Sequence, residues 1–127
     1  ESSLIQLVNL ETGEINPLFT VDSETPEPVI SPDGKWIAYL DRVPGYMADG
    51  LFVAHPDGTK RRLLVQLDYW QLVGKISWTP DGEWLSFSVL DSDAFDPVST
   101  VGLVNLYSCQ VISLPQLDGV ILGWVDR

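Results

Sequence analysis

The stretch that decides the fold is Ile30–Leu40, which reads ISPDGKWIAYL. It recurs over Trp78–Ser88 as WTPDGEWLSFS, so the two copies are 48 residues apart, from Asp33 to Asp81. Ser or Thr followed by Pro-Asp-Gly is typical of a tight turn, because Pro sets φ at about −65° and Gly accepts a positive φ. Side chains alternate in character after each turn, which predicts a β-strand. The repeat therefore predicts two equivalent turn–strand units.

A second repeated unit is interleaved with the first. It consists of a strand, a short turn and another strand, and it occurs over Leu4–Phe19, Leu51–Val65 and Leu103–Leu114. In the third copy Ser108-Cys109 stands where the other two have a glycine turn. No helix of useful length competes, because Gly and Pro interrupt every window. The two units together predict that the chain is all-β and that four-stranded antiparallel sheets follow one another along it.

Four-stranded units at a spacing of about 40–50 residues are typical of β-propeller blades. The stretches Ile30–Tyr39, Leu51–Leu64 and Trp78–Phe87 resemble the TolB-type, WD-like propeller repeat. Relatives of that repeat also occur in prolyl-oligopeptidase-like peptidases and tricorn-type proteases. The resemblance implies an interaction role rather than catalysis, and a periplasmic or extracellular location in a bacterium. It predicts one propeller segment over 1–127, made of a partial blade at 4–19, blades at 28–66 and 75–114, and the inner strand of a further blade at 119–125.

A 48-residue period in 127 residues corresponds to about two and a half blades, whereas propellers usually close with roughly four to eight. We therefore expect that the chain does not close a ring by itself. Three explanations are open. The chain is a fragment of a longer propeller, or an open stack capped by another protein, or one member of an oligomer. In the oligomer, Val120–Trp124 of one copy completes the Leu4–Phe19 ribbon of the next.

Charge and composition exclude several classes of function. Acidic residues outnumber basic ones 18 to 7, for a net charge of −11, so nucleic acid and anionic membrane surfaces are not expected partners. No apolar run reaches about 18 residues, so membrane insertion is not expected. The single cysteine, Cys109, excludes a disulfide within the chain, and the single histidine, His55, excludes a multi-His metal site. The sequence predicts no cofactor and no metal site.

The predicted connections differ between the two ends of the sheets. Those at one end are short, and those at the other are long; we call the latter end the long-loop face, formed by 20–27, 42–50, 66–74, 91–101 and 115–118. It carries nine carboxylates and one base, Arg42, together with aromatic side chains. Acidic and aromatic groups on loops favour a protein or cationic partner. The alternative is that the acids keep the chain soluble and the aromatics cover blade edges. The predicted partner-binding residues are Tyr46, Met47, Tyr69, Trp70, Phe95, Asp91, Asp93 and Asp96.

Candidate catalytic and metal motifs are weak. The run 91–96 departs from a calcium loop, because Phe95 stands at its fifth position and no closing Glu follows. His55 precedes a turn, and the chain has no Gly-x-Ser-x-Gly elbow, so a hydrogen-bonding role in the turn is favoured over a catalytic triad. We expect a non-enzymatic protein-interaction or scaffold module. The alternatives are a regulatory propeller segment of a prolyl-oligopeptidase-like or tricorn-like hydrolase, and a self-assembling structural subunit.

Overall fold

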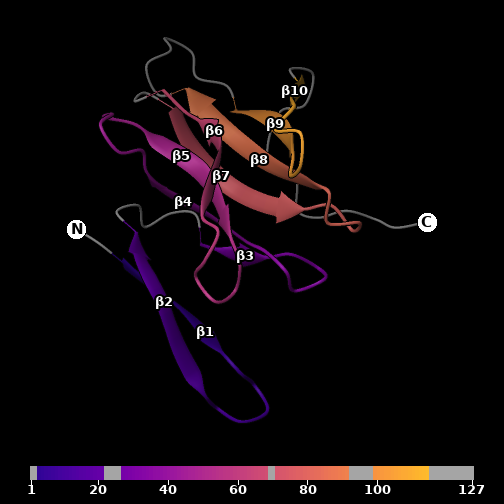
Figure 1. Ribbon diagram of the computed structural model, residues 1–127. Coiled ribbons are helices and arrows are strands. Elements are labelled where there is room, and N and C mark those ends of the chain that lie inside the picture. The colour runs from indigo at the N-terminus through magenta and orange to yellow at the C-terminus, as the bar shows by residue number, and fades with distance from the viewer. Residues whose placement is uncertain (1–2, 22–26, 69–70, 92–98, 115–127) are drawn as a thin grey trace.

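The computed structural model describes residues 3–21, 27–68, 71–91 and 99–114, and all regular structure within them is β (Figure 1). The strands form one hairpin and two four-stranded antiparallel sheets, in the orders β1-β2, β3-β4-β5-β6 and β10-β9-β8-β7. The predicted all-β fold is thus confirmed. The strands are β1 (Ser3–Val8), β2 (Ile15–Val21), β3 (Val29–Ile30), β4 (Ile37–Arg42), β5 (Asp49–Ala54), β6 (Arg62–Gln66), β7 (Gln71–Trp78), β8 (Trp84–Asp91), β9 (Ser99–Asn105) and β10 (Val111–Leu114).

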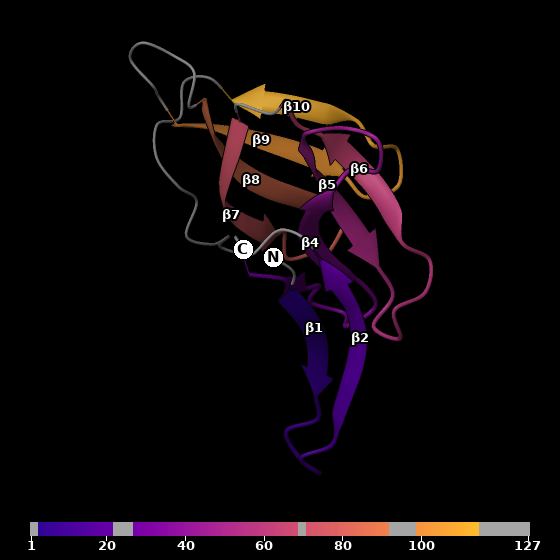
Figure 2. The same cartoon turned by 90° about the vertical axis from the view of Figure 1, so that its left-hand side faces the viewer.

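The three sheets are stacked in chain order. The hairpin extends away from the sheet that contains β3–β6, and the sheet that contains β7–β10 lies on the other side of that sheet (Figures 1 and 2). The inner strands β3 and β7 lie side by side, and the indole N–H of Trp78 donates a 2.9 Å hydrogen bond to the carbonyl of Val29. The stacking therefore brings equivalent inner strands of the two complete sheets together.

The main apolar core lies between the two four-stranded sheets. The side chains of Ala38, Leu40 and Val53 point from β4 and β5 toward Leu85 and Phe87 of β8, and all five are buried. The opposite face of β4 packs on the hairpin, in a second cluster that contains Ile5, Val21, Ile37, Tyr39 and Ala54. Strand β4 is thus buried on both faces, which explains why its sequence reads as an almost unbroken apolar run.

The repeated Pro-Asp-Gly turns have the same hydrogen bonds in both copies. The Ser31 hydroxyl donates to the Asp33 carboxylate at 2.7 Å, and the Thr79 hydroxyl donates to Asp81 at 2.6 Å. Each hydroxyl also accepts the N–H of the tryptophan that follows the turn. The glycines of the two turns have φ of +74° and +72°, a region that favours glycine. The sequence repeat is thus a repeat of hydrogen-bonding geometry.

Three connections that the sequence predicted as long are shorter. The connection 91–101 shortens because β8 continues to Asp91 and β9 already begins at Ser99. The connection 42–50 is a turn of 43–48, because β4 continues to Arg42 and β5 begins at Asp49. The connection 66–74 is also shorter, because β7 already begins at Gln71. A bulge between Val73 and Ile76 lets this strand continue past its glycine, and the hydroxyl of Ser88 accepts the N–H of Lys75 there. Extending the strands satisfies backbone groups that a loop would leave to water.

A glycine in β9 makes room for a core aromatic ring. Gly102 is paired with Phe87 across the ladder, and a Cβ atom built at Gly102 would lie 2.6 Å from the Phe87 ring. No real Cβ contact is that short, so a larger residue forces the ring or the strand to move.

We therefore predict that Gly102→Ala lowers the free energy of unfolding by about 1–3 kcal/mol, the usual cost of overpacking a core. Urea denaturation measures this. The control is Ser113→Ala, because Ser113 is the exposed residue paired with Gly102 in β10, and its change should stay within about 0.5 kcal/mol. Equal stability of Gly102→Ala and the wild type would contradict this close packing.

The turn carboxylates predict a loss of stability in acid. Hydrogen bonds from the Ser31 hydroxyl and the Lys35 N–H lower the pKa of Asp33 below its ordinary value of 3.8. Those from the Thr79 hydroxyl and the Glu83 N–H lower the pKa of Asp81 in the same way. A lowered pKa in the folded state means that the stabilisation is fully present above pH 3.8 and is lost as the pH falls through the lowered pKa.

Replacing both carboxylates (Asp33→Asn with Asp81→Asn) should therefore reduce stability at neutral pH. The difference in stability between the variant and the wild type should shrink as the pH falls below 3.8, the ordinary pKa of the two carboxyl groups. Thermal unfolding between neutral pH and the acid limit measures it. A difference that does not change with pH would show that the two carboxylates contribute no charge-dependent stability.

Candidate functional site

The turn between β4 and β5 forms one part of the long-loop face. The N–H of Val43 donates to the carbonyl of Ala48 at 3.0 Å, and the N–H of Tyr46 donates to that of Val43 at 3.1 Å. Val43 and Ala48 are buried, while Tyr46 is 59% and Met47 is 86% exposed. A hydrogen-bonded turn with a buried base thus presents two large apolar side chains to solvent.

The other predicted partner-binding residues are Tyr69, Trp70, Asp91, Asp93, Phe95 and Asp96. Tyr69, Trp70, Asp93, Phe95 and Asp96 lie outside the described residues, as does the predicted inner strand at 119–125. Asp91 ends β8, but only its backbone is described. Of the predicted site, the described structure therefore brings together Tyr46 and Met47.

An ion pair connects the two strand ends beneath this turn. The guanidinium of Arg42 lies 3.2 Å from the carboxylate of Asp49, and the two side chains are 51% and 32% exposed. The backbone N–H of Arg42 donates to the carboxylate of Asp41 at 2.8 Å. Water competes with an exposed pair of this kind, so it contributes about 0–1 kcal/mol. Arg42, the base that the sequence placed on this face, is thus engaged with the acids beside it.

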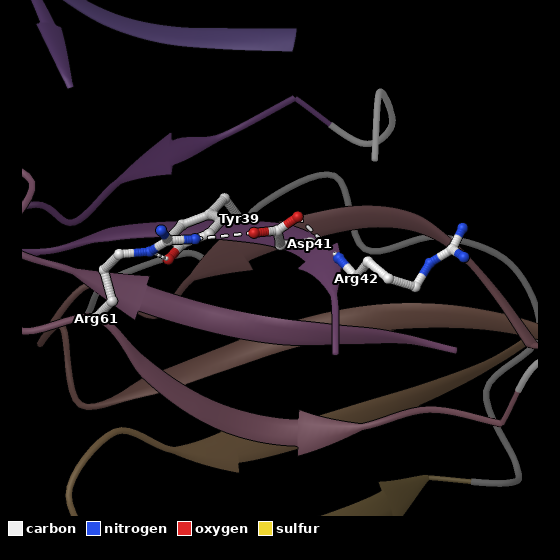
Figure 3. Close-up of polar contacts among 4 residues, drawn as sticks. All are labelled: Tyr39, Asp41, Arg42 and Arg61. Carbon is white, nitrogen blue, oxygen red and sulfur yellow. Dashed lines mark hydrogen bonds and ion pairs between the residues drawn. The ribbon is translucent and has the colours of Figure 1, made fainter. Parts of the chain in front are cut away.

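A second polar cluster, which sequence reasoning missed, lies between the hairpin and β4 (Figure 3). Arg61 donates from Nε to the Tyr39 hydroxyl and from a terminal nitrogen to the Asp41 carboxylate, both at 2.8 Å. Its guanidinium also lies over the ring of Phe19, 4.4 Å from the centroid. Burial raises the pKa of Tyr39, and the hydrogen bond from Arg61 opposes that rise only in part. Arg61 therefore joins β2, β4 and the turn before β6.

His55 lies in the turn between β5 and β6, away from the long-loop face. Its backbone N–H donates to the Thr59 carbonyl at 2.8 Å, and its backbone carbonyl accepts the N–H of Gly58 at 2.9 Å. Its ring contacts the indole of Trp36 edge-on, with 4.4 Å between centroids. Within the described ranges no group of three His, Cys, Asp or Glu side chains could hold a metal ion. No membrane-spanning helix is found in those ranges either.

Cys109 takes the place of a turn glycine. In the turns after β1 and β9, the side-chain oxygens of Asn9 and Asn105 accept two backbone N–H groups each. The residues that close these turns, Gly13 and Cys109, have φ of +75° and +58°. The equivalence of the two turns explains why an exposed cysteine adopts a conformation that favours glycine.

The architecture is similar to that of solved propeller proteins. TolB from Acinetobacter baumannii matches 93% of this chain with a TM-score of 0.69 and 15% identity. A putative TolB from Agrobacterium tumefaciens matches 88% with a TM-score of 0.63 and 19% identity. The fold is that of a partial TolB-type β-propeller. An oligogalacturonate lyase in complex with manganese shares it over 84% of the chain, with a TM-score of 0.64 and 20% identity.

These comparisons confirm the predicted TolB-type fold over part of each matched protein. The matched regions span 28%, 44% and 28% of those three proteins, so this chain corresponds to a portion of each. No protein-family model matches the sequence, and no curated protein is significantly similar to it. At this level of identity the likeness establishes the fold alone.

The Arg61 cluster predicts an unequal effect of two arginine substitutions. Arg61→Ala leaves the buried Tyr39 hydroxyl without this donor and removes the contact with the hairpin, so it should destabilise the chain by about 1–3 kcal/mol. Arg61→Lys should restore only part of the loss, because an ammonium lacks the fork of donors. Chemical denaturation measures stability, and amide exchange of β1 and β2 measures hairpin attachment.

Arg42→Ala is the matched control, because it breaks only the exposed pair with Asp49. It should cost less than about 1 kcal/mol and leave the exchange of the hairpin amides unchanged. Equal effects of the two alanine variants would contradict the role given to Arg61.

Proposed function

We propose that this propeller segment is a non-enzymatic protein-interaction module whose long-loop face contacts a protein partner. The observation that supports it most directly is the turn of Val43–Ala48. Its backbone is hydrogen-bonded and its base is buried, yet Tyr46 and Met47 are largely exposed. Large apolar side chains held out on an ordered turn are typical of protein interfaces, where Tyr is a frequent anchor and Met adapts to the partner surface.

The charge around this turn supports a partner with basic groups. In its described part, the long-loop face carries the carboxylates of Glu27, Asp49 and Asp68, and its one base, Arg42, is paired with Asp49. A net charge of −11 adds long-range attraction for a cationic surface. The interface we propose therefore combines an apolar contact at Tyr46 and Met47 with an acidic surround, and its association rate should fall as salt is added.

The likeness to TolB supports a proposal about where the protein is located. A location in the periplasm or outside a bacterial cell is proposed from the name of the matched proteins. The hypotheses of a regulatory segment in a hydrolase and of a self-assembling subunit remain predictions. Hydrolysis of a peptide substrate by the purified chain would replace the proposal with an enzymatic one.

The test is the double variant Tyr46→Ser with Met47→Ser, compared with Tyr107→Ser with Leu10→Ser. The control residues Tyr107 and Leu10 are 66% and 95% exposed, respectively. They lie in the turns after β9 and β1, at the strand ends opposite the long-loop face. We expect affinity capture with the wild-type chain to recover a partner, and the Tyr46/Met47 variant to lose about 10-fold or more in affinity for it. The control variant should retain the partner. Equal affinity of the two variants, with circular dichroism showing both folded, would overturn the proposal.

A further inference from the structure

The tripeptide Pro-Asp-Gly occurs three times, and each copy contains a bond that can rearrange. The copies are centred on Asp33, Asp57 and Asp81. In an Asp–Gly pair the backbone nitrogen of glycine can attack the side-chain carboxyl carbon, because glycine has no side chain to obstruct it. The new N–C bond closes a five-membered succinimide, and the amide proton and the carboxyl O–H leave together as water. Water then opens the ring at either carbonyl, which restores aspartate or leaves isoaspartate, whose backbone runs through the β-carbon.

All three copies share two protections against this reaction. In each turn the glycine N–H donates at 2.9 Å to the carbonyl of the residue that precedes Pro-Asp-Gly. Each aspartate carboxylate accepts a hydroxyl and a backbone N–H, and these hydrogen bonds lower its pKa. An ionised carboxylate reacts slowly, because its departing oxygen needs a proton. The rate in the folded chain therefore depends on how often each turn opens.

The hydroxyls that protect Asp33 and Asp81 are anchored to the scaffold. Ser31 is 3% exposed, and its hydroxyl also accepts the backbone N–H of Trp36, which leads into β4. Thr79 is half-buried, and its hydroxyl accepts the backbone N–H of Trp84, the first residue of β8. Both donors are thus tied to the start of a strand that lies in the core.

The turn that contains Asp57 is held less firmly. Its carboxylate accepts the hydroxyl and the backbone N–H of Thr59, and both residues are exposed. Two backbone positions of this turn lie in the left-handed region, Gly58 with φ of +85° and Lys60 with φ of +56°. That region is unfavourable for lysine, because its Cβ atom crowds the backbone carbonyl. An exposed turn with a strained residue opens at a lower free-energy cost than a turn anchored to the core.

We propose that Asp57–Gly58 is the site at which the folded protein isomerises, ahead of Asp33–Gly34 and Asp81–Gly82. A fourth pair, Asp49–Gly50, lies in β5, where Gly50 is buried and paired with residues of β4 and β6. The pair Asp118–Gly119 lies outside the described residues. The modification requires only water, so it is independent of the partner proposed for the long-loop face.

The same turn packs against the hairpin. A Cβ atom built at Gly58 would lie 3.5 Å from the carbonyl oxygen of Leu18 and 3.6 Å from the ring of Phe19, both in β2. Arg61 follows in the chain and bonds to Tyr39 and Asp41 while it stacks on Phe19. Isoaspartate adds its β-carbon to the backbone and so displaces the turn from β2. We therefore expect the product to loosen the attachment of the hairpin.

The experiment compares the three copies within one chain. The 127-residue protein is kept near neutral pH at physiological temperature for several weeks and is then digested. Mass spectrometry with electron-based fragmentation distinguishes isoaspartate from aspartate at each position. We expect isoaspartate to form at Asp57 at least about fivefold faster than at Asp33 or Asp81. In concentrated guanidinium chloride the turns are lost, so the three copies should react at rates within about twofold of one another. Equal rates in the folded protein, or the same excess at Asp57 in denaturant, would overturn the proposal.

The matched variants each remove one hydroxyl. Thr59→Val should raise the rate at Asp57 by about two- to fivefold and leave the rate at Asp81 unchanged, because the lost hydroxyl donates to Asp57. The control, Thr79→Val, should raise the rate at Asp81 and leave the rate at Asp57 unchanged. An equal rise at both positions in Thr59→Val would indicate global unfolding rather than opening of one turn, which overturns the proposal.

Amide exchange in β2 tests the effect on the hairpin. Wild-type protein that has accumulated isoaspartate at position 57 should exchange its β2 amides faster than fresh protein. Asp57→Glu cannot close the five-membered ring, so its aged and fresh samples should exchange alike. Equal acceleration in the aged wild type and the aged Asp57→Glu variant would overturn the role given to Asp57.

Discussion

The apolar contact between the two four-stranded sheets is the interaction on which the rest of the structure depends. A sheet that carries apolar side chains on both faces is stable only when both faces are shielded from water. Strand β4 is buried on both faces. Ala38 and Leu40 point toward β8, while Ile37 and Tyr39 point toward the hairpin. Phe87 crosses the ladder over Gly102 and fills the layer between the sheets. Each sheet thus depends on its neighbour for stability, as expected of stacked repeats.

The hairpin β1–β2 is the least supported part of this stack. In the described structure it packs on one sheet only, through the cluster that includes Ile5 and Val21. Arg61 strengthens this contact because it bonds to Tyr39 and Asp41 of β4 and stacks on Phe19 of β2. An element with few neighbours opens more easily than the core.

The two ends of the strands have different roles. At one end, Pro-Asp-Gly turns close each sheet with the same hydrogen bonds, and their carboxylates are used within the turn. At the other end, the turn of Val43–Ala48 directs Tyr46 and Met47 into solvent. Side chains that are not needed inside the fold are available for binding. The scaffold and the candidate site are therefore separated along the strand direction.

Local chemistry made the strands and turns predictable from the sequence alone. The 48-residue repeat, the alternation after each turn and the glycine positions led to the correct fold class, because each depends on neighbouring residues. The exposure of Tyr46 and Met47 was also anticipated. Tertiary structure decided the rest. The alternation along β4 places Tyr39 and Asp41 on the same face of the strand. Arg61 is 20 residues away from Asp41, and only the packing of the sheets brings it into contact with Tyr39 and Asp41. Such contacts join residues far apart in the chain, and no local pattern encodes them.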